Sequence, residues 1–354
     1  MPSVPKILRT LRGVQSDTPP IWIMRQAGRY LPEYLAVRQQ AGDFLTLCYT
    51  PDLAAEVTLQ PIDRFDLDAA IIFSDILVVS HGLGQKVWFE AGEGPRLEPL
   101  TSMEDIKSLD RPGMKDRLSP VYEAVSKVRA KLPEDKALIG FCGAPWTVAT
   151  YMIEGGGSKD HVMTRAFAYR HPDAFSALID ILVDASIEHL KLQIAAGAQI
   201  VQVFDSWAGS LTAEGFSRWC SEPIARIASA IRAHASDVPV IGFPRGAGAH
   251  LPGFVSASMV DAVALDTSAD LDWVRSQLPA TVPMQGNLDP ALMLSDADQV
   301  RDAVFKIRRT MRGRPHVLNL GHGIPKEADI AMVEALISAA RMPLGDLMAL
   351  AHAS

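Results

Sequence analysis

The chain has 354 residues, of which 48% are hydrophobic and 21% are charged, a composition typical of a globular protein with a large core. Its 34 basic and 41 acidic residues give a formal net charge of −7. This charge argues against nucleic acid as the main partner, because phosphate binding needs a basic face. An anionic ligand is repelled by such a protein and needs a local cluster of Arg or Lys.

The cysteines and the apolar runs indicate the cellular compartment of the protein. Cys48, Cys142 and Cys220 lie far apart, which argues against a disulfide framework and favours a reducing compartment. The N-terminal segment lacks the apolar stretch of a signal peptide, and no apolar run reaches the ~18 residues of a membrane span. We therefore expect a cytoplasmic protein that does not act at a membrane.

The first element along the chain is predicted to be a short amphipathic helix. Ser3 is the expected N-cap, and Pro5 is expected near the first turn. Ile7, Leu8 and Leu11 share one helical face, which we expect to be buried.

Eight short apolar runs follow, each ending in a polar or turn residue. Runs of this length without strict alternation fit strands that are buried on both faces, as in a parallel sheet. The runs are residues 21–24, 69–73, 137–142, 199–204, 239–243, 262–265, 282–285 and 316–320.

Helical patterns separate these runs. The clearest covers residues 175–196, with Gly197 as its stop signal. A second covers residues 212–235, with Thr212 as N-cap, and a third covers residues 296–311.

Eightfold alternation of strand and helix predicts a single-domain (β/α)8 barrel over residues 1–354. An open doubly wound sheet has the same alternation, but no strand is followed by G-x-G-x-x-G. The longest gap, after the second run, contains residues 86–100, which predict an inserted β-hairpin turning at Gly92–Gly94. The glycines at 155–157 lack a phosphate-loop sequence and predict a loop over the barrel mouth or a plain turn.

Polar residues end most of the runs, where barrels place their catalytic groups. None of these ends carries a Lys, which argues against Schiff-base chemistry there. Four of the groups are potential metal ligands, but the sequence lacks H-E-x-x-H and no His stands two residues before a Cys, so we expect no metal site. The strand-end groups are Arg25, Ser74, Asp75, Asp205, Ser206, Arg245, Asp266, Asn287 and His322.

The densest candidate site is Met24–Tyr34 together with Arg38. Arg25, Arg29 and Arg38 lie within fourteen residues beside a strand end, and guanidinium groups bind carboxylates in bidentate fashion. Gly28 permits a tight turn that can also offer N–H groups to an anion. Solvated arginines at the start of a surface helix are the alternative.

With these residues in view, the sequence resembles the uroporphyrinogen decarboxylase family over nearly its whole length. The resemblance rests on seven segments: MRQAGRYLPEY (24–34), LDAAIIFSDIL (67–77), GFCGAPWT (140–147), TYMIEGGGSKD (150–160), VQVFDSWAG (201–209), MQGNLDP (284–290) and NLGHGI (319–324). The stretch after His322 is one residue shorter than the usual family form.

The resemblance implies a barrel with one deep cleft, usually in a homodimer. It implies cofactor-free decarboxylation of the four acetate arms of uroporphyrinogen III to give coproporphyrinogen III. Substrate carboxylates would bind Arg25 and Arg29, beside the backbone of Gln26, Ala27 and Gly28, and an outer carboxylate would bind Arg38. Asp75 would face the pyrrole N–H groups and stabilise the transition state, while Tyr151, Ser206 and His322 would line the site.

Two other functions stay open at this stage. A non-catalytic tetrapyrrole carrier would keep the arginines without needing Asp75. A corrinoid-linked methyltransferase would need zinc on a His-x-Cys pair, which the sequence lacks. The proton donor of a decarboxylase is also open between His322, Tyr151 and a carboxylic acid of the substrate.

Overall fold

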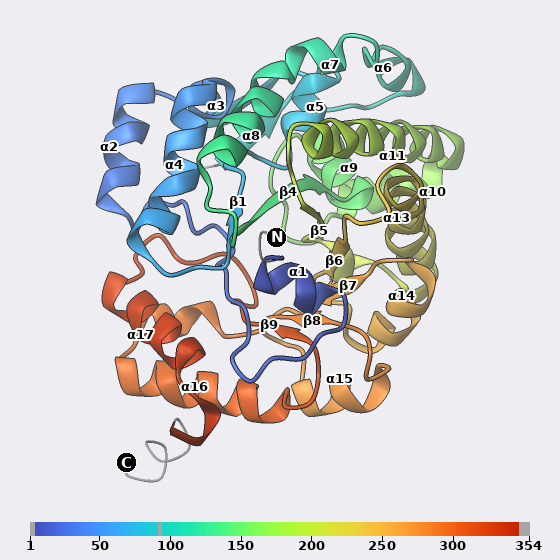
Figure 1. Cartoon of the computed structure of the whole chain (residues 1–354). Helices are drawn as coiled ribbons and strands as arrows, with labels where there is room; N and C mark the ends of the chain where they lie inside the picture. The colour runs from blue at the N-terminus through green and yellow to red at the C-terminus, as the bar shows by residue number, and fades with distance from the viewer. Residues whose placement is uncertain (1–3, 91–93, 347–354) are drawn as a thin grey trace.

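The computed structural model describes residues 4–90 and 94–346. Its centre is a curled parallel sheet of seven strands in the order β1-β4-β5-β6-β7-β8-β9, which confirms the predicted barrel (Figure 1). The strands are β1 (Ala69–Ile71), β4 (Ala137–Gly143), β5 (Ile200–Asp205), β6 (Val240–Pro244), β7 (Ala262–Ala264), β8 (Met284–Gln285) and β9 (His316–Val317).

The eighth position of the barrel is filled by the first apolar run, residues 21–24, which is not a regular strand. On one side it forms a single parallel bridge between Ile21 and Leu318, just beyond β9. On the other side the Asp68 N–H, just before β1, donates to the Ile21 carbonyl at 2.8 Å. The segment therefore joins the two outer strands and closes the barrel.

Hydrogen bonds to side chains explain why residues 21–24 do not form a regular β-strand. The N–H groups of Ile21, Ile23 and Met24 donate to side-chain oxygens rather than to a neighbouring strand. The acceptors are Asp68 at 2.6 Å, Gln26 at 3.1 Å and Asn319 at 2.9 Å. Buried N–H groups must be paired, and here side chains meet that need.

Helices surround the sheet, and α1 lies at the amino-terminal end of the barrel (Figure 1). The longer ones are α2 (Pro32–Ala41), α4 (Pro51–Arg64), α8 (Ser119–Lys131), α9 (Pro145–Glu154), α10 (Val162–Arg170), α11 (Pro172–Ala195), α13 (Glu222–His234), α16 (Ala297–Thr310) and α17 (Ile330–Arg341). The shorter ones are α1 (Lys6–Leu11), α3 (Phe44–Tyr49), α5 (Val78–Gly82), α6 (Met103–Lys107), α7 (Met114–Arg117), α12 (Ala213–Gly215), α14 (Leu251–Ala257) and α15 (Leu271–Gln277).

The predicted helices form, with two corrections. In α1 the buried face and the place of Pro5 next to the first turn are confirmed, but Pro5 is itself the N-cap residue, in place of the predicted Ser3, which lies outside the described residues. The predicted helix 212–235 begins as expected with Thr212 accepting from the Gly215 N–H, but a π-helical turn at Phe216–Ser221 separates α12 from α13. Pro223 in the first turn of α13 has no N–H to continue a regular α-helical ladder across this point.

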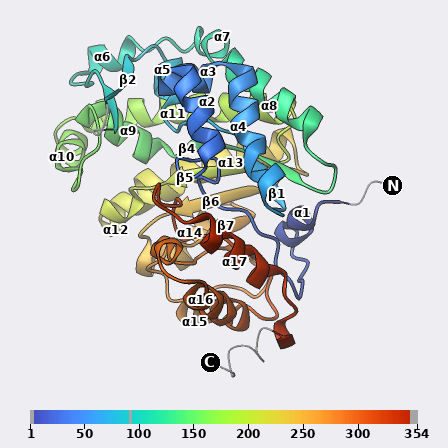
Figure 2. The same cartoon turned by 90° about the vertical axis from the view of Figure 1, so that its left-hand side faces the viewer.

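The predicted hairpin is confirmed as β2 (Val87–Glu90) paired antiparallel with β3 (Gly94–Leu97), although part of its predicted turn at Gly92–Gly94 lies outside the described residues. The glycine run is tied to this hairpin, because Gly156 bridges Arg96 and the Leu97 N–H donates to the Gly155 carbonyl at 3.0 Å. It is therefore a paired turn rather than a free loop. Figure 2 shows the hairpin, α10 and α12 at the end of the barrel opposite α1.

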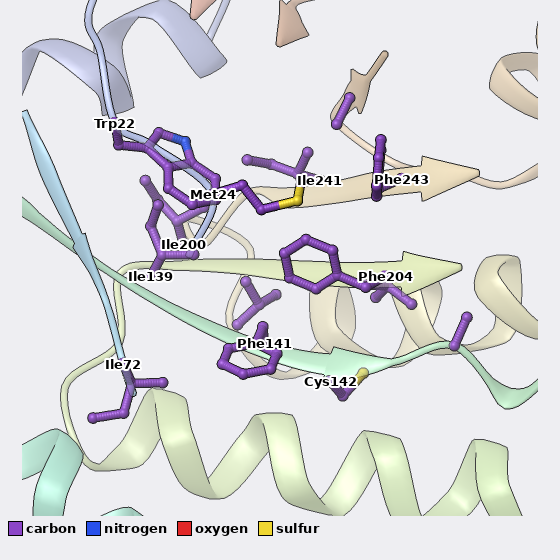
Figure 3. Packing of buried hydrophobic residues seen from close by; sticks show 14 of the residues in the cluster. Trp22, Met24, Ile72, Ile139, Phe141, Cys142, Ile200, Phe204, Ile241 and Phe243 are labelled. Carbon is purple, nitrogen blue, oxygen red and sulfur yellow. The ribbon is translucent and has the colours of Figure 1, made fainter. Parts of the chain in front are cut away.

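Alternation along the strands separates a barrel interior from a helix-facing layer. Phe141 on β4, Phe204 on β5 and Phe243 on β6 point into the barrel, whereas Cys142 points toward the surrounding helix (Figure 3). Neighbouring rings meet edge to face, with centroids 5.6 Å apart for Phe141 and Phe204 and 6.0 Å for Phe204 and Phe243. This aromatic row forms an apolar floor beneath the carboxyl ends of the strands.

Candidate active site

Arg25 stands at the end of the closing segment in an unusual backbone conformation. Its φ of 65° is left-handed, which costs a non-glycine residue about 1 kcal/mol or more. The side chain is exposed and lies against Gly323, where a Cβ would come within 2.5 Å of the Arg25 Cδ. Glycine at 323 therefore leaves the room that Arg25 occupies. The shortened stretch after His322 is anchored here too, because the Ile324 N–H donates to the Met24 carbonyl at 2.9 Å.

The turn after Arg25 offers free backbone donors. A Cβ at Gly28 would lie 2.9 Å from the Arg25 carbonyl, so a larger residue would disturb this tight turn. Within residues 4–90 and 94–346, the N–H groups of Ala27, Gly28 and Arg29 have no hydrogen-bond partner. Such a row of free N–H groups beside an arginine is suited to a carboxylate.

Gln26 differs from its neighbours in this turn. Its N–H donates to the Ile23 carbonyl at 2.9 Å, and its carbonyl accepts from the Tyr30 hydroxyl at 2.9 Å. Its fully buried side chain accepts from the Ile23 N–H and donates to the Ala69 carbonyl. Both its backbone and its side chain are thus engaged in holding the closing segment against β1.

Asp75 lies just past the end of β1. Its Oδ1 accepts from the Leu77 N–H at 2.8 Å, while its Oδ2 has no partner among the residues that the structure describes. Burial raises the pKa of the Asp75 carboxyl above its ordinary value, opposed by the Leu77 N–H and by the charge of Arg25. One oxygen is therefore fixed by the backbone, and the other is available to a ligand.

Ser206 and His322 line a cavity of about 660 Å³ at the carboxyl ends of β5, β6 and β7. The His322 ring lies 6.4 Å from the Phe243 ring, and its buried Nδ1 has no partner among the described residues. Burial, together with the charges of Arg245 and Arg25, lowers the pKa of His322 to about 4. The imidazole is therefore neutral near pH 7, able to donate and accept one hydrogen bond each.

Tyr151 on α9 lies beside this cavity. Its ring centroid is 6.3 Å from that of Trp207, a cavity-wall residue. Burial, and then the negative charge of Asp75, raise the pKa of the Tyr151 hydroxyl, while Arg25 opposes the shift. These effects place Tyr151 within electrostatic reach of both Asp75 and Arg25 and keep it protonated.

Arg38 lies on α2, and Arg29 precedes that helix. Both lower the pKa of Tyr34, which burial raises. Arg38 lies 5.8 Å from the Phe44 ring centroid, and its buried Nη1 has no partner among the described residues. The charge of Arg25 acts on Asp75, Tyr151 and His322, and His322 shares the cavity with Ser206, so these five residues lie near one another. Arg38 and Asp75 both act on the pKa of Cys48, which places Arg38 on the side of Asp75.

Two further strand-end residues form hydrogen bonds that hold neighbouring segments of the protein in place. Asp205, fully buried at the end of β5, accepts from the Thr147 hydroxyl at 2.6 Å, and burial raises its pKa to about 6. Thr147 in turn accepts from the Trp207 N–H at 3.1 Å and so holds the wall of the cavity. Asn287 donates to the carbonyls of Asp266 and Ala269.

Sequence reasoning missed the aromatic floor and the part of the cavity wall formed by His161 and Arg165. Phe141, Phe204 and Phe243 resemble ordinary strand residues, and only the alternation of inward and outward positions marks them. His161 is the N-cap residue of α10, and Arg165 lies in the first half of that helix. The sequence shows no motif at either position that indicates a binding site. Their place in the cavity depends on how α10 packs.

The chain matches the family model described as "Uroporphyrinogen decarboxylase (URO-D)" over residues 3–342. It is 50% identical to a uroporphyrinogen decarboxylase of Rhizorhabdus wittichii, covering 95% of this chain and 97% of that one. It is 48% identical to that of Rhodospirillum rubrum, with coverage of 95% and 97%.

The chain belongs to the uroporphyrinogen decarboxylase family. The resemblance predicted from the motifs is therefore confirmed, as is the prediction that the chain is an enzyme of the decarboxylase class. Among solved structures, a methyltransferase from Methanosarcina mazei superposes with a TM-score of 0.79 at 17% identity, covering 95% of this chain and 97% of that one. At that identity the likeness supports the fold alone.

Within the described ranges, no three His, Cys, Asp or Glu side chains gather in a way that could hold a metal ion. Cys48, Cys142 and Cys220 are all free and buried. In the same ranges, no helix is long and apolar enough to cross a membrane.

Proposed function

We propose that this chain removes the carboxyl groups of the four acetate arms of uroporphyrinogen III, in porphyrin biosynthesis, and releases coproporphyrinogen III and four CO2. The observation that carries the proposal is the Asp75 carboxylate, with one oxygen fixed by Leu77 and the other without a partner among the described residues. It lies within electrostatic reach of Arg25 and Tyr151, and Arg25 also acts on His322 in the cavity wall. The proposal treats residues 1–354 as one catalytic unit, working as a homodimer in the cytoplasm. Three free, buried cysteines suit a reducing compartment.

The chemistry needs an electron sink, because loss of CO2 leaves an electron pair on the arm. A pyrrole supplies that sink itself. Protonation of the ring carbon next to the one bearing the arm gives a cationic, iminium-like ring, which accepts the pair as CO2 departs, leaving an exocyclic C=CH2 group. A second proton then completes the methyl group, and the proton first added to the ring is lost, which restores the pyrrole. One proton is taken up for each CO2 released, so the step balances without a cofactor.

Asp75 stabilises this ring cation. Its free Oδ2 accepts pyrrole N–H bonds, and the fixed negative charge favours the cationic ring over the neutral one. Because Leu77 holds the carboxylate in place, little reorganisation accompanies the reaction. A single central carboxylate can serve each of the four rings in turn if the substrate rotates between steps.

The substrate's eight carboxylates need cations, because the chain as a whole is negative. Arg25 and the free N–H groups of Ala27, Gly28 and Arg29 form one anion site next to Asp75. Arg29 and Arg38, which both act on Tyr34 of α2, supply further positive charge for other arms of the substrate. Neutral His322 and the Ser206 hydroxyl supply hydrogen bonds rather than charge.

The decisive assay is anaerobic incubation of the purified chain with uroporphyrinogen III, then oxidation and chromatography of the porphyrins. We expect stepwise appearance of hepta-, hexa-, penta- and tetracarboxylate products without added cofactor. Bound but unchanged substrate would show a carrier instead. Activity that is lost on dialysis against a chelator and restored by a metal would contradict the cofactor-free mechanism.

A further inference from the structure

A second group of cations lines the cavity on the side away from Arg25. Lys159, Arg165 and Arg245 all line the cavity of about 660 Å³ whose wall also contains Ser206 and His322. Arg245 follows β6, the middle strand of the seven, whereas Arg25 follows the segment that joins the two outer strands. The order of the barrel therefore places Arg25 and Arg245 on opposite sides of the mouth.

These cations are not neutralised within the protein. Across residues 4–90 and 94–346, none of Lys159, Arg165 and Arg245 forms an ion pair, and the buried Nε of Arg165 has no hydrogen-bond partner. The Arg245 guanidinium lies 5.9 Å from the Trp207 ring centroid. In a chain with a net charge of −7, three unpaired cations around one cavity form a local site for an anion.

Among the described residues, the carboxylates on the same wall form no ion pair with these cations. Asp266 is engaged by its own loop, accepting from the Gly246 N–H at 2.7 Å and from the N–H and hydroxyl of Ser268. Asp160 is exposed at the rim. The cavity wall thus holds three cations and two carboxylates, which leaves an excess of positive charge for an anion.

His161 provides an independent sign that a ligand binds here. The residue is 1% exposed, it lines the cavity, and its ring lies 4.8 Å from the Trp207 ring. Neither ring nitrogen has a partner among the described residues. Buried polar groups in folded proteins are nearly always paired, so an imidazole in this position indicates that a bound molecule completes its hydrogen bonds.

We infer that His161, Arg165 and Arg245 form a second carboxylate subsite, which holds side-chain carboxylates of the tetrapyrrole while another ring reacts at Asp75. The inference rests on the proposed function. A tetrapyrrole carries carboxylates around its whole perimeter. When one acetate arm lies at Arg25, arms of the far rings reach the opposite side of the mouth, where Arg245 and Arg165 receive them.

The test uses R165Q and R245Q, with R170Q as the matched control. Arg170 is an exposed arginine on the same helix, α10, and does not line the cavity. Steady-state decarboxylation of uroporphyrinogen III is measured anaerobically for each variant and for the double variant. We expect KM to rise about tenfold for each cavity variant, as for the loss of a partly exposed charge-assisted bond, and kcat to stay within about twofold.

A second measurement identifies the arm. Coproporphyrinogen III keeps only the propionates, so its inhibition constant rises with KM if the subsite holds a propionate. It stays constant while KM rises if the subsite holds an acetate. Circular dichroism and thermal unfolding confirm that each variant folds, and R165K and R245K replace any that do not, with an intermediate rise in KM expected.

The subsite and the proposed function fail differently. If the wild-type chain decarboxylates the substrate and the folded cavity variants keep the KM of R170Q, the subsite inference is overturned and the function stands. If the wild-type chain leaves uroporphyrinogen III unchanged, both are overturned, because the inference depends on that substrate.

Discussion

Replacing Asp75 with asparagine keeps the shape of the side chain and removes its charge. The amide oxygen can still accept from the Leu77 N–H, now at 2.8 Å from Oδ1, so the loop after β1 is preserved. What disappears is the attraction between the carboxylate and the ring cation. At ~4 Å and an effective dielectric of ~20 this attraction is roughly 4 kcal/mol, which corresponds to about a thousandfold in rate.

The stability of Asp75→Asn moves in the opposite direction to its activity. Burial raises the folded-state pKa of Asp75 above the unfolded value, so the ionised carboxylate destabilises the free protein at neutral pH. The neutral amide removes that cost. We therefore expect a Tm equal to or above that of the wild type, together with the loss of turnover.

The assay compares kcat for uroporphyrinogen III in Asp75→Asn and in Asp205→Asn. Asp75 lies just past the end of β1 and Asp205 ends β5, but Asp205 is fully buried and accepts from the Thr147 hydroxyl. We expect about a thousandfold loss for the first and less than tenfold for the second. Turnover within tenfold of wild type in a folded Asp75→Asn variant would refute the electrostatic role.

Other consequences can be measured on the same material. Gln26→Ala should lower the free energy of unfolding, measured by urea unfolding, by about 2 kcal/mol or more, because it leaves buried backbone groups unpaired. The KM for the substrate should change less than twofold. A higher KM with unchanged stability would instead show that Gln26 binds the substrate. The free energy of unfolding should fall as the pH falls from about 6.5 to about 4, because burial lowers the pKa of His189 and His316 to about 4 and the unfolded chain takes up these protons first. Each histidine contributes up to about 3 kcal/mol, and a flat urea midpoint between pH 7 and pH 5 would contradict this. Tyr151→Phe should keep kcat within about tenfold, because burial and Asp75 raise the hydroxyl pKa and make it a poor acid; a loss of a thousandfold would identify it as the proton donor.

The sequence by itself determined the fold class and the identity of the family. Buried parallel strands must be apolar on both faces, so seven of the eight runs could be recognised without any structure. Helix ends were also local, since capping side chains such as Thr212 and Asp296 bond to the N–H groups of their own first turn. Arg25 and Asp75 could be named because they follow strands whose ends must converge.

Only the tertiary structure decided which side chains meet and which groups stay unpaired. The first run closes the barrel through Asp68, Gln26 and Asn319, and two of these lie more than forty residues away along the chain. The same dependence on distant contacts hid the places of His161 and Arg165 in the cavity wall, whereas Arg245 could be named from the sequence as a strand-end residue. Local sequence patterns reveal the spacing of hydrophobic residues and the capping of helices. The hydrogen-bond partner of a buried N–H or guanidinium group, by contrast, can come from any part of the chain that the fold places next to it.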